Sequence, residues 1–288
     1  MATVKKGEPM DKHTTFRIGG RAGVFLVPDT GAELATAVAE YPCAFILGGG
    51  SNLLVSDEGV DAVISMSGLK EMEVRTEADG ATHIVVGAGY AFTSLSRVAY
   101  RKGLAGLEFA FGIPGTVGGA VVMNAGAGGG EVKDCLESAR IFSRGDFHDV
   151  SAAELGLSYR SSALPAGTVV VSATFALMPG DRREIRWKME RGIDARKQSQ
   201  PLAYPSAGSV FKNPPGDFAG RLIDSLGLKG LRVGDAEISS RHANFIVNMG
   251  KATARQVLAL IEKVEETVLD KTGIRLEREI RLVGSFHP

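Results

Sequence analysis

The sequence predicts an α+β protein of more than one domain, and three observations support that prediction. The chain has 288 residues, 44% hydrophobic and 23% charged, the balance of a globular protein with length for about two domains. Its predicted strands and helices follow one another in mixed order, without a clean strand–helix alternation. Its 37 glycines gather in a few clusters, which indicates backbone that comes close to another group.

The composition excludes several classes of function. Lys plus Arg and Asp plus Glu both number 33, so no net field draws the chain onto nucleic acid or an anionic membrane. Cys43 and Cys135 form neither a metal-type cluster nor a disulfide framework, which is typical of a reducing compartment. There is no apolar leader and no run of ~18 apolar residues. We expect a cytoplasmic monomer that acts on small molecules, without a nucleic-acid or membrane partner and without a metal.

The elements predicted before residue 178 mix short strands with three helices. In chain order they are a strand and turn over 16–27, a helix over 31–41, a buried strand over 44–47, strands over 61–66, 72–76 and 83–88, a helix over 92–102 that ends at Gly103, a short helix over 117–123, and strands over 139–143 and 168–177. The strand over 44–47 enters the first glycine cluster directly.

The remainder of the chain predicts a compact α/β domain. A charged segment from Pro179 to Lys197 is typical of a solvent-facing helix, and prolines at 201, 205, 214 and 215 then break the pattern. A domain boundary is therefore expected near 180–200. The elements beyond it are a strand over 209–212, a helix over 217–226, a strand over 244–248, a long amphipathic helix over 253–271 and a strand over 275–283.

Two glycine-rich loops, residues 48–54 and 112–130, are the first candidates for a binding site. No Lys or Arg occurs between Arg21 and Lys70 or between Lys102 and Lys133, so backbone would have to hold any phosphate bound there. Glycine exposes consecutive N–H groups, and the predicted short helix adds its N-terminal dipole near Thr116. A single cluster of this kind is more often a tight turn, whereas two long clusters favour a binding function.

Neither loop matches a common nucleotide motif. The glycines over 112–119 are spaced Gly-x-x-Gly-x-x-Gly-Gly, and no acidic residue is suitably placed for the dinucleotide fingerprint. Gly250-Lys251 is followed by Ala252, so a triphosphate-binding loop is also absent. A different dinucleotide fold is required.

Four segments resemble the UDP-N-acetylenolpyruvoylglucosamine reductase family, and the resemblance spans nearly the whole chain. They are His13-Thr-Thr-Phe-Arg-Ile-Gly-Gly20, Gly48-Gly-Gly-Ser-Asn-Leu-Leu54, Gly112-Ile-Pro-Gly-Thr-Val-Gly-Gly-Ala120 and Gly208-Ser-Val-Phe-Lys-Asn-Pro214. The resemblance implies an FAD-binding fold of the vanillyl-alcohol-oxidase (PCMH) type in two subdomains, 1–66 and 67–185. It also implies a C-terminal α/β substrate domain over 186–288.

The family resemblance also implies a reaction and a cofactor site. NADPH reduces a non-covalently bound FAD and leaves, and the enolpyruvyl ether of a UDP-sugar then receives a hydride from flavin N5, in peptidoglycan precursor synthesis. The implied FAD contacts are in the two loops: Gly48, Gly49, Gly50, Ser51, Asn52, Gly112, Ile113, Pro114, Gly115, Thr116, Gly118, Gly119 and Asn124.

Three catalytic positions of the family match Arg160, Ser209 and Glu279. Hydride addition leaves negative charge on the carbon beside the substrate carboxylate, and this charge must spread into the carboxylate as an enolate. Arg160 suits a bidentate grip on that carboxylate, and Glu279 could share a proton or hydrogen bond with the developing charge. Ser209 would deliver the proton to carbon, a role that needs a nearby cation or strong hydrogen bond. Taken singly, each residue is more often exposed and structural. Their joint occurrence in family motifs favours catalysis.

Similarity gives five candidates for substrate contacts: Tyr159, Arg196, Asn213, Lys229 and His242. Lys229 and His242 belong to the UDP end, although a lysine after a helix and a lone histidine are each more often structural. The segment between Asn213 and Gly220 is short, which indicates the compact subclass of the family. How that subclass covers the diphosphate is left open, with Tyr204 as a candidate.

Two alternatives stay open. A flavin oxidase of the same fold often attaches flavin through a loop His or Cys; neither glycine loop holds one, and His83 and Cys135 lie outside the usual setting. A nucleotide-sugar-binding protein that has lost catalysis is the second alternative, and the intact set of Arg160, Ser209 and Glu279 disfavours it.

Overall fold

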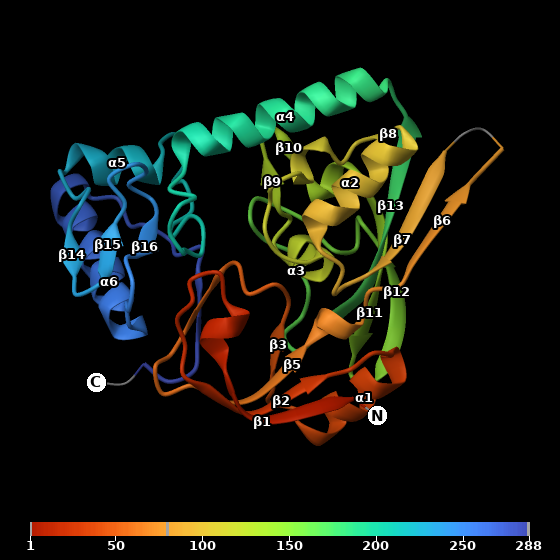
Figure 1. Cartoon of the computed structure of the whole chain (residues 1–288), viewed down its shortest axis with the longest axis horizontal. Helices are drawn as coiled ribbons and strands as arrows, with labels where there is room; N and C mark the ends of the chain where they lie inside the picture. The colour runs from red at the N-terminus through yellow and green to blue at the C-terminus, as the bar shows by residue number, and fades with distance from the viewer. Residues whose placement is uncertain (1, 79–80, 287–288) are drawn as a thin grey trace. The chain divides into compact units, whose positions relative to one another are not determined.

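The computed structural model describes residues 2–78 and 81–286 (Figure 1). The chain divides into two compact units, each described separately below. Unit 1 comprises Met1–Lys5, Phe25–Gly49 and Ala62–Ala195, and unit 2 comprises Lys6–Val24, Gly50–Asp61 and Arg196–Pro288. The mixed helix and sheet content confirms the predicted α+β class, whereas the division into three parts at 66/67 and 185/186 stays a prediction. None of the helices in these described stretches is long and apolar enough to cross a membrane.

A six-stranded antiparallel sheet forms the larger part of unit 1 (Figure 1). Its order is β12 (Asp146–Ser151), β11 (Leu136–Ser143), β13 (Val169–Pro179), β7 (Thr82–Gly87) and β6 (Met72–Thr76), with β8 (Leu104–Ala105) paired to β13. Alternate residues of β7 face the core, and Ile84 and Val86 are fully buried. β6 has its predicted bounds, whereas β12, in which only Phe147 and Val150 are apolar, was not expected.

Two helices of unit 1 position the second glycine loop. α2 (Phe92–Lys102) ends at Gly103 as predicted, because Gly103 takes the left-handed conformation with φ 71°. Its first residue, Phe92, is fully buried against Phe109 and Phe175, with ring centroids 6.0 and 6.5 Å away. The short helix α3 (Val117–Val122) packs on β13 and β7. The packed helix α3 therefore forms the middle of the second loop, and α2 precedes the loop in the chain.

The remaining parts of unit 1 include α1 (Gly31–Glu40), whose N-cap Thr30 accepts a hydrogen bond from the Glu33 N–H. β3 (Phe45–Leu47) pairs in parallel with β5 (Val60–Ser65) within the four-stranded sheet β1-β2-β5-β3. The strand predicted over 16–27 begins only at Arg21. Other elements are β1 (Thr3–Pro9), β2 (Arg21–Val27), η2 (Met66–Gly68), η3 (Glu108–Ala110), β9 (Gly126–Ala127), β10 (Gly130–Glu131), η4 (Val132–Asp134) and α4 (Arg182–Ser199).

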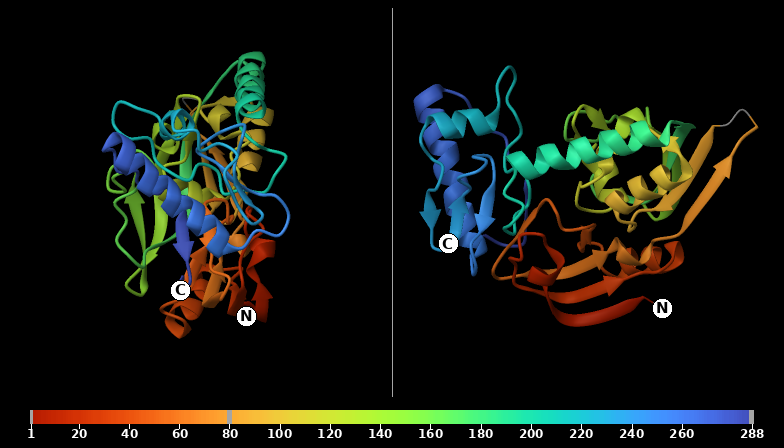
Figure 2. Two further views of the ribbon diagram at one scale, coloured as in Figure 1. Left: turned by 90° about the vertical axis from the view of Figure 1, so that its left-hand side faces the viewer. Right: turned by 45° about the horizontal axis from the view of Figure 1, so that its top comes forward.

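The core of unit 2 is organised by α6 (Ala254–Thr272), which lies against the three-stranded sheet β14-β15-β16 (Figure 2). Its buried residues recur at helical spacing, among them Val257, Leu260, Ile261 and Val264. Thr253 and Gln256 form a capping box, and the Asp57 carboxylate accepts the next two free N–H groups, at 2.8 and 3.0 Å. The strands are β14 (Arg232–Val233), β15 (Ala236–Ile238) and β16 (Ile246–Asn248), and α5 (Ala219–Ser225) and η1 (Met10–His13) complete the helices of the unit.

Two strands predicted in this unit are mostly irregular. The segment over 209–212 forms only one bridge, Phe211 with Arg278, and the strand expected over 275–283 is reduced to β17 (Arg281–Val283). The cause is the hydrogen bonding of Phe211, whose N–H and C=O are both bonded to the side chain of Asn244 rather than to a neighbouring strand. β17 pairs in parallel with β4 (Leu53–Val55), a pairing that joins residues far apart in the sequence.

Candidate functional site

The two glycine loops meet within unit 1. A Cβ on Gly49 would lie 2.5 Å from the Cα of Gly115 and 3.1 Å from the Thr116 nitrogen, and a Cβ on Gly48 would lie 2.8 Å from Thr116 Oγ1. Carbon atoms pack at about 3.5–4.0 Å, so a side chain fits at Gly49 only if the second loop moves, and at Gly48 only if the Thr116 side chain moves. The second loop can therefore approach the first because residues 48 and 49 are glycines and have no side chain.

The second loop is held by its neighbours in the fold. An isolated bridge between Ala91 and Thr116 fixes the backbone, with Phe92 N–H donating to Gly115 C=O (3.1 Å). The hydroxyl of Thr93 accepts from Gly112 N–H at 2.9 Å and lies 3.1 Å from the Ile113 carbonyl oxygen. Thr93 is the first-turn residue of α2, so the helix fixes the start of the loop.

Polar groups at this junction are left without partners. Thr116 Oγ1 is buried and forms no hydrogen bond in the structure. The backbone N–H groups of Thr116 and Gly119 likewise have no acceptor among the residues that the structure describes. A buried hydroxyl of this kind is costly unless something satisfies it, whereas Thr116 and Gly119 as residues are half-buried. A cluster of free N–H groups and a hydroxyl, without a nearby Lys or Arg in the sequence, fits a phosphate- or carbonyl-bearing cofactor held by backbone.

Arg160 lies at the tip of a tight turn in unit 1. Ser158 and Ser161 exchange backbone hydrogen bonds at 3.0 and 3.2 Å, and Arg160 between them has φ 54°. Its guanidinium donates to the Gly126 carbonyl at 3.0 Å and lies 5.3 Å from the centre of the Tyr159 ring. The Tyr159 side chain is 49% exposed. The structure thus brings together two predicted residues, one for catalysis and one for substrate.

Asn124, predicted as a cofactor contact, is fully buried directly after α3. Its amide nitrogen donates to Glu131 Oε2 (2.7 Å) and to the Ser158 carbonyl (3.0 Å), and its amide oxygen accepts from Lys133 N–H (2.9 Å). Both N–H groups of the amide are therefore used within the protein, and one of them is bonded to the turn that carries Arg160.

Unit 2 brings the rest of the first loop beside Glu279. Asn52 donates its side-chain N–H to the Glu279 carbonyl (2.9 Å), and Asn52 C=O accepts from Arg281 N–H (3.0 Å), in line with the pairing of β4 with β17. Gly50 has φ 63°, and its carbonyl accepts from Thr15 N–H at 3.0 Å. Ser51, between Gly50 and Asn52, is half-buried.

Ser209 is held next to the same strand segment. Glu279 N–H donates to the carbonyl of Val210 at 2.8 Å, so the residue after Ser209 is bonded directly to Glu279. The buried Asn244 fixes this segment through Val210 N–H, Phe211 N–H and the Phe211 carbonyl, at 2.9, 2.9 and 2.8 Å. The structure therefore bonds Glu279 both to Asn52 and to Val210, the residue that follows Ser209.

Lys212, the cation nearest to Ser209 in the sequence, has a different partner. Its Nζ lies 2.5 Å from Glu277 Oε1. This ion pair joins the residue after Phe211 to the residue before Arg278, directly beside the Phe211–Arg278 bridge. Arg278 is in turn bound by both carboxylate oxygens of Glu265 on α6, at 2.6 Å each, which raises the pKa of Arg278 and anchors the strand that carries Glu279.

Two of the predicted substrate residues, Lys229 and His242, lie close together in one cluster of polar side chains. Lys229 forms an ion pair with Asp224 at 2.7 Å, and it is close enough to His242 to lower the pKa of that histidine. Burial is the larger cause of the lowered pKa, so the imidazole is neutral near pH 7. His242 Nδ1 accepts from Asn244 N–H at 3.2 Å, which leaves Nε2–H as the donor.

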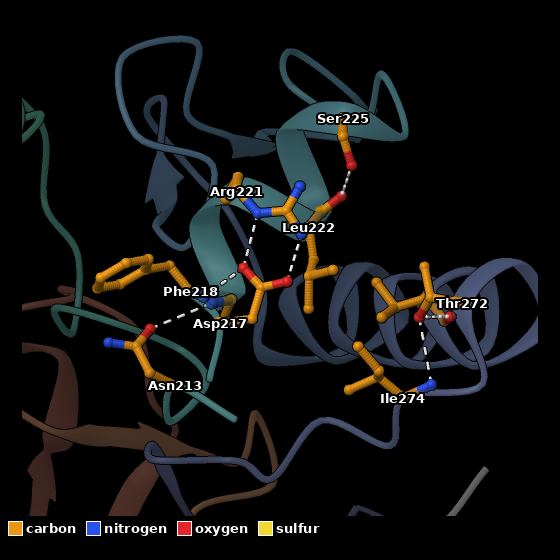
Figure 3. A network of polar contacts seen from close by, with 10 residues as sticks. Asn213, Asp217, Phe218, Arg221, Leu222, Ser225, Thr272 and Ile274 are labelled. Atoms are coloured by element: carbon orange, nitrogen blue, oxygen red, sulfur yellow. Dashed lines mark hydrogen bonds and ion pairs between the residues drawn. The ribbon is translucent and has the colours of Figure 1, made fainter. Parts of the chain in front are cut away.

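Asn213 and Arg196 have other surroundings. The Asn213 side-chain oxygen accepts from Ala219 N–H at 3.1 Å and so caps α5, beside the pair that Asp217 forms with Arg221 (Figure 3). Arg196, in the last turn of α4, is partly buried, and this burial lowers its pKa. Tyr204 is 47% exposed.

Sequence reasoning missed Thr93 and Asn244. Both are ordinary polar residues outside the glycine motifs, and each acts only through backbone groups far away in the sequence. Thr93 offers no signal beyond its place as an expected helix start, whereas Asn244 stands in an otherwise apolar run, Ala243 to Val247, where a buried amide needs partners.

Comparisons with known proteins cover the whole chain. A family model described as "UDP-N-acetylenolpyruvoylglucosamine reductase, C-terminal domain" matches residues 200–283, and one described as "FAD binding domain" matches residues 22–149. A UDP-N-acetylenolpyruvoylglucosamine reductase of Agathobacter rectalis is 46% identical, covering 97% of this chain and 93% of its own length. A second such reductase, from Staphylococcus aureus strain COL, is 43% identical over 99% of this chain and 93% of its own length. The crystal structure of UDP-N-acetylenolpyruvylglucosamine reductase (MurB) from Thermus caldophilus superimposes with a TM-score of 0.82 at 40% identity, covering 99% of both chains.

Proposed function

This chain belongs to the family of UDP-N-acetylenolpyruvoylglucosamine reductases, and we propose that it reduces UDP-N-acetylglucosamine enolpyruvate to UDP-N-acetylmuramate, with NADPH as the reductant. The family makes it an FAD-binding oxidoreductase of peptidoglycan synthesis. The observation that carries the proposal from the structure is the junction of the two glycine loops, where a buried Thr116 hydroxyl and free N–H groups lack partners. A flavin dinucleotide satisfies such groups.

The glycine loops would hold FAD through backbone. When bound, the flavin takes up a hydride from a nicotinamide and passes one on to a substrate. Thr116, Gly119 and their neighbours would supply N–H donors and one hydroxyl to its polar atoms. Neither loop contains Lys or Arg. The loops would therefore contact the diphosphate through backbone N–H groups and uncharged side chains, without a positively charged side chain.

Arg160 is proposed to bind the substrate carboxylate. Its backbone takes a left-handed conformation that favours glycine, at the third position of the Ser158–Ser161 turn. Strain of about 1–3 kcal/mol at a non-glycine residue is commonly retained at functional sites. A bidentate guanidinium–carboxylate pair would stabilise the enolate that forms when a hydride adds to the neighbouring carbon.

Ser209 and Glu279 are proposed to act on the proton. The hydroxyl of Ser209 delivers a proton to the carbon beside the carboxylate, and the Glu279 carboxyl shares a hydrogen bond with the charge that develops there. The backbone bond from Glu279 to Val210 and the clamp of Asn244 support this pairing, because they fix the two positions side by side. Lys212 is paired with Glu277, and a hydrogen bond with Glu279 or with the substrate is proposed to activate the Ser209 hydroxyl.

Lys229 and His242 are proposed to bind the UDP end. An ammonium and a neutral imidazole that donates from Nε2 offer a charge for the diphosphate and a single directional hydrogen bond. Tyr159, Arg196 and Asn213 are proposed as further substrate contacts on the strength of the family motifs; the Asn213 oxygen already caps α5, so its amide N–H groups would make that contact.

The experiment separates the two half-reactions under anaerobic conditions. NADPH should bleach the flavin of the purified holoenzyme, and the enolpyruvyl substrate should restore its colour. Ser209→Ala should leave bleaching unchanged and slow the recovery of colour by about 100-fold, a typical effect of losing a general acid. Ser225→Ala, which removes a hydroxyl bonded only to the Leu222 carbonyl, should leave both rates unchanged.

Two results would contradict the proposal. A flavin that NADPH does not bleach, or that the enolpyruvyl substrate does not reoxidise, excludes the reductase. A Ser209→Ala enzyme in which both half-reactions slow equally excludes the proton-delivery role. Flavin that stays with the protein after acid precipitation would favour an oxidase with covalent flavin, but burial raises the pKa of Cys135 to about 12 and so makes that thiol a poor nucleophile.

A further inference from the structure

We propose that Asn124 is a positioning residue for Arg160, an inference that rests on the carboxylate-binding role proposed above for Arg160. Asn124 is 34 residues before Ser158 in the sequence, and its amide donates to the Ser158 carbonyl at 3.0 Å. Ser158 begins the turn that carries Arg160. Asn124 therefore fixes the backbone from which the guanidinium projects.

The surroundings of the Asn124 side chain leave it a single orientation. The side chain has no exposed surface, one amide hydrogen is bonded to Glu131 Oε2 at 2.7 Å, and the other is bonded to Ser158. The amide oxygen accepts from Lys133 N–H at 2.9 Å. With both N–H groups used inside the protein, the amide has no donor left for a bound cofactor.

The backbone of Asn124 accounts for the residue type. Its φ is 41°, and its N–H donates to the Val121 carbonyl at the end of α3. Among residues with a side chain, Asn is one of the few that adopt this left-handed conformation readily. Glycine would also fit the backbone but has no amide, so Asn alone combines the turn with two side-chain donors.

A second contact closes a ring around Arg160. The guanidinium donates to the carbonyl of Gly126, and Gly126 pairs with Glu131 across the β9–β10 hairpin. Glu131 is also the residue to which the Asn124 amide donates. The guanidinium of Arg160 is thus bonded to the hairpin at Gly126, and the turn that carries Arg160 is bonded to Asn124, which itself donates to the hairpin at Glu131.

This ring also explains how Arg160 keeps a strained backbone. A left-handed arginine is retained only where the surrounding structure imposes it, and the Ser158–Ser161 exchange by itself fits several turn types. The bond from Asn124 to the Ser158 carbonyl adds an anchor outside the turn. Without this anchor, the turn can relax and move the guanidinium away from the carboxylate.

The test measures the coupling between Asn124 and Arg160 in the holoenzyme. Asn124→Ala should slow reoxidation of the reduced flavin by the enolpyruvyl substrate by about 10- to 100-fold, since a displacement of about 1 Å costs that much in a reaction that depends on alignment. Reduction by NADPH should stay within about twofold. In an Arg160→Ala background, Asn124→Ala should slow reoxidation by less than about threefold further, because Asn124 acts through a side chain that is already absent.

A matched control uses another buried asparagine. Asn248 in unit 2 also makes three side-chain hydrogen bonds, to the Phe16 carbonyl and from the N–H groups of Gly250 and Ala252. Asn248→Ala removes equivalent bonds, so any effect it has on reoxidation should multiply with that of Arg160→Ala. A loss of stability alone would give the same multiplicative result for Asn124→Ala.

A second variant covers the possibility that Asn124→Ala does not fold. In the exchanged pair Asn124→Asp with Glu131→Gln, the side chains at 124 and 131 can still bond to each other, while the donor to the Ser158 carbonyl is lost. The exchanged pair should fold, bind FAD and remain slow in reoxidation.

The outcomes are distinct. Reoxidation at the wild-type rate in the exchanged pair, or a multiplicative loss for Asn124→Ala with Arg160→Ala, overturns the positioning role. If Arg160→Ala alone reoxidises at the wild-type rate, the proposed function of Arg160 is wrong, and this inference falls with it. A slow Arg160→Ala enzyme with multiplicative coupling overturns the positioning role alone.

Discussion

Replacing Gly49 by alanine tests whether the contact between the two glycine loops is needed for the cofactor. The new Cβ would lie 2.5 Å from Gly115 Cα, 2.9 Å from Gly115 C and 3.1 Å from Thr116 N, all of them backbone atoms. Relief to ordinary packing at about 3.5–4.0 Å requires the loops to separate by about 1 Å or more. Binding sites tolerate displacements of about 0.5 Å. In Gly49→Ala the N–H donors of the two loops would therefore be too far from their correct positions to bind FAD together.

The expected magnitude comes from the donors that move. A hydrogen bond from N–H to a charged group contributes about 1.5–3 kcal/mol, so losing one at the junction should weaken FAD binding by about 10- to 100-fold. Overpacking should also lower the free energy of unfolding by about 1–3 kcal/mol. Titration of the deflavinated protein with FAD, followed by flavin fluorescence, measures the first effect, and chemical denaturation measures the second.

Two further substitutions should have a smaller effect on FAD binding, or none. In Gly48→Ala the close contact, at 2.8 Å, is with the Thr116 side chain, which can rotate, so the loss of affinity should be smaller than in Gly49→Ala. Gly192, in the middle of α4, has no atom within 4 Å of its Cβ position, and Gly192→Ala should leave FAD binding unchanged. If Gly49→Ala binds FAD as tightly as Gly192→Ala does, the contact between the two loops is not needed for the cofactor.

Four further results are expected. Gly119→Ala has room, since outside its own helix backbone the nearest described atom to its Cβ position is Thr116 Oγ1 at 3.7 Å. The deflavinated protein should be as stable or more stable by helix propensity, and weaker FAD binding by titration would then report contact with the ligand. Thr116→Val removes a buried hydroxyl without a partner; calorimetry should find the deflavinated protein no less stable, with FAD bound up to about 10-fold more weakly. Asn244→Ala leaves the N–H and C=O of Phe211 unpaired, and denaturant titration should show a loss of about 2–5 kcal/mol. The pKa of His242 is lowered from 6.5 by burial, so the unfolded chain takes up a proton first as the pH falls below 7; the free energy of unfolding should decrease there, and His242→Gln should remove that part of the pH dependence.

The local elements could be predicted because their signals are local. α2 was expected to end at Gly103 from the residue type alone, and the structure gives that glycine a left-handed φ of 71°. The buried face of α6 follows the apolar spacing of its sequence. The failure around Phe211 has a non-local origin: the segment has a strand-like sequence, but its backbone groups are bonded to the side chain of Asn244, 33 residues away, which no periodicity reveals.

The candidate site shows a different limit. Asn52 and Glu279 are 227 residues apart, and their contact depends on a parallel pairing of β4 with β17 that neither short strand specifies by itself. The family resemblance predicts Asn124 as a cofactor contact within the second glycine loop, whereas its bonding partners emerge only when Glu131, Lys133 and Ser158 are folded around it. Family motifs identify candidate residues. Only the folded structure shows which of these residues already form hydrogen bonds within the protein through all their polar atoms.

Glycine itself has two roles in these loops, which the sequence could not separate. Gly49 and Gly118 lack a side chain because other protein atoms, Gly115 Cα at 2.5 Å and Ala88 Cβ at 2.8 Å, already occupy the space a Cβ would need. Gly119 has no such neighbour, and its N–H is unbonded in the described part of the chain. Close approach of backbone to backbone thus explains the first pair without a ligand, and only the second kind of glycine points to one. The two loops first build a rigid junction, and the binding surface is what that junction leaves unsatisfied, namely the Thr116 hydroxyl and the neighbouring N–H groups.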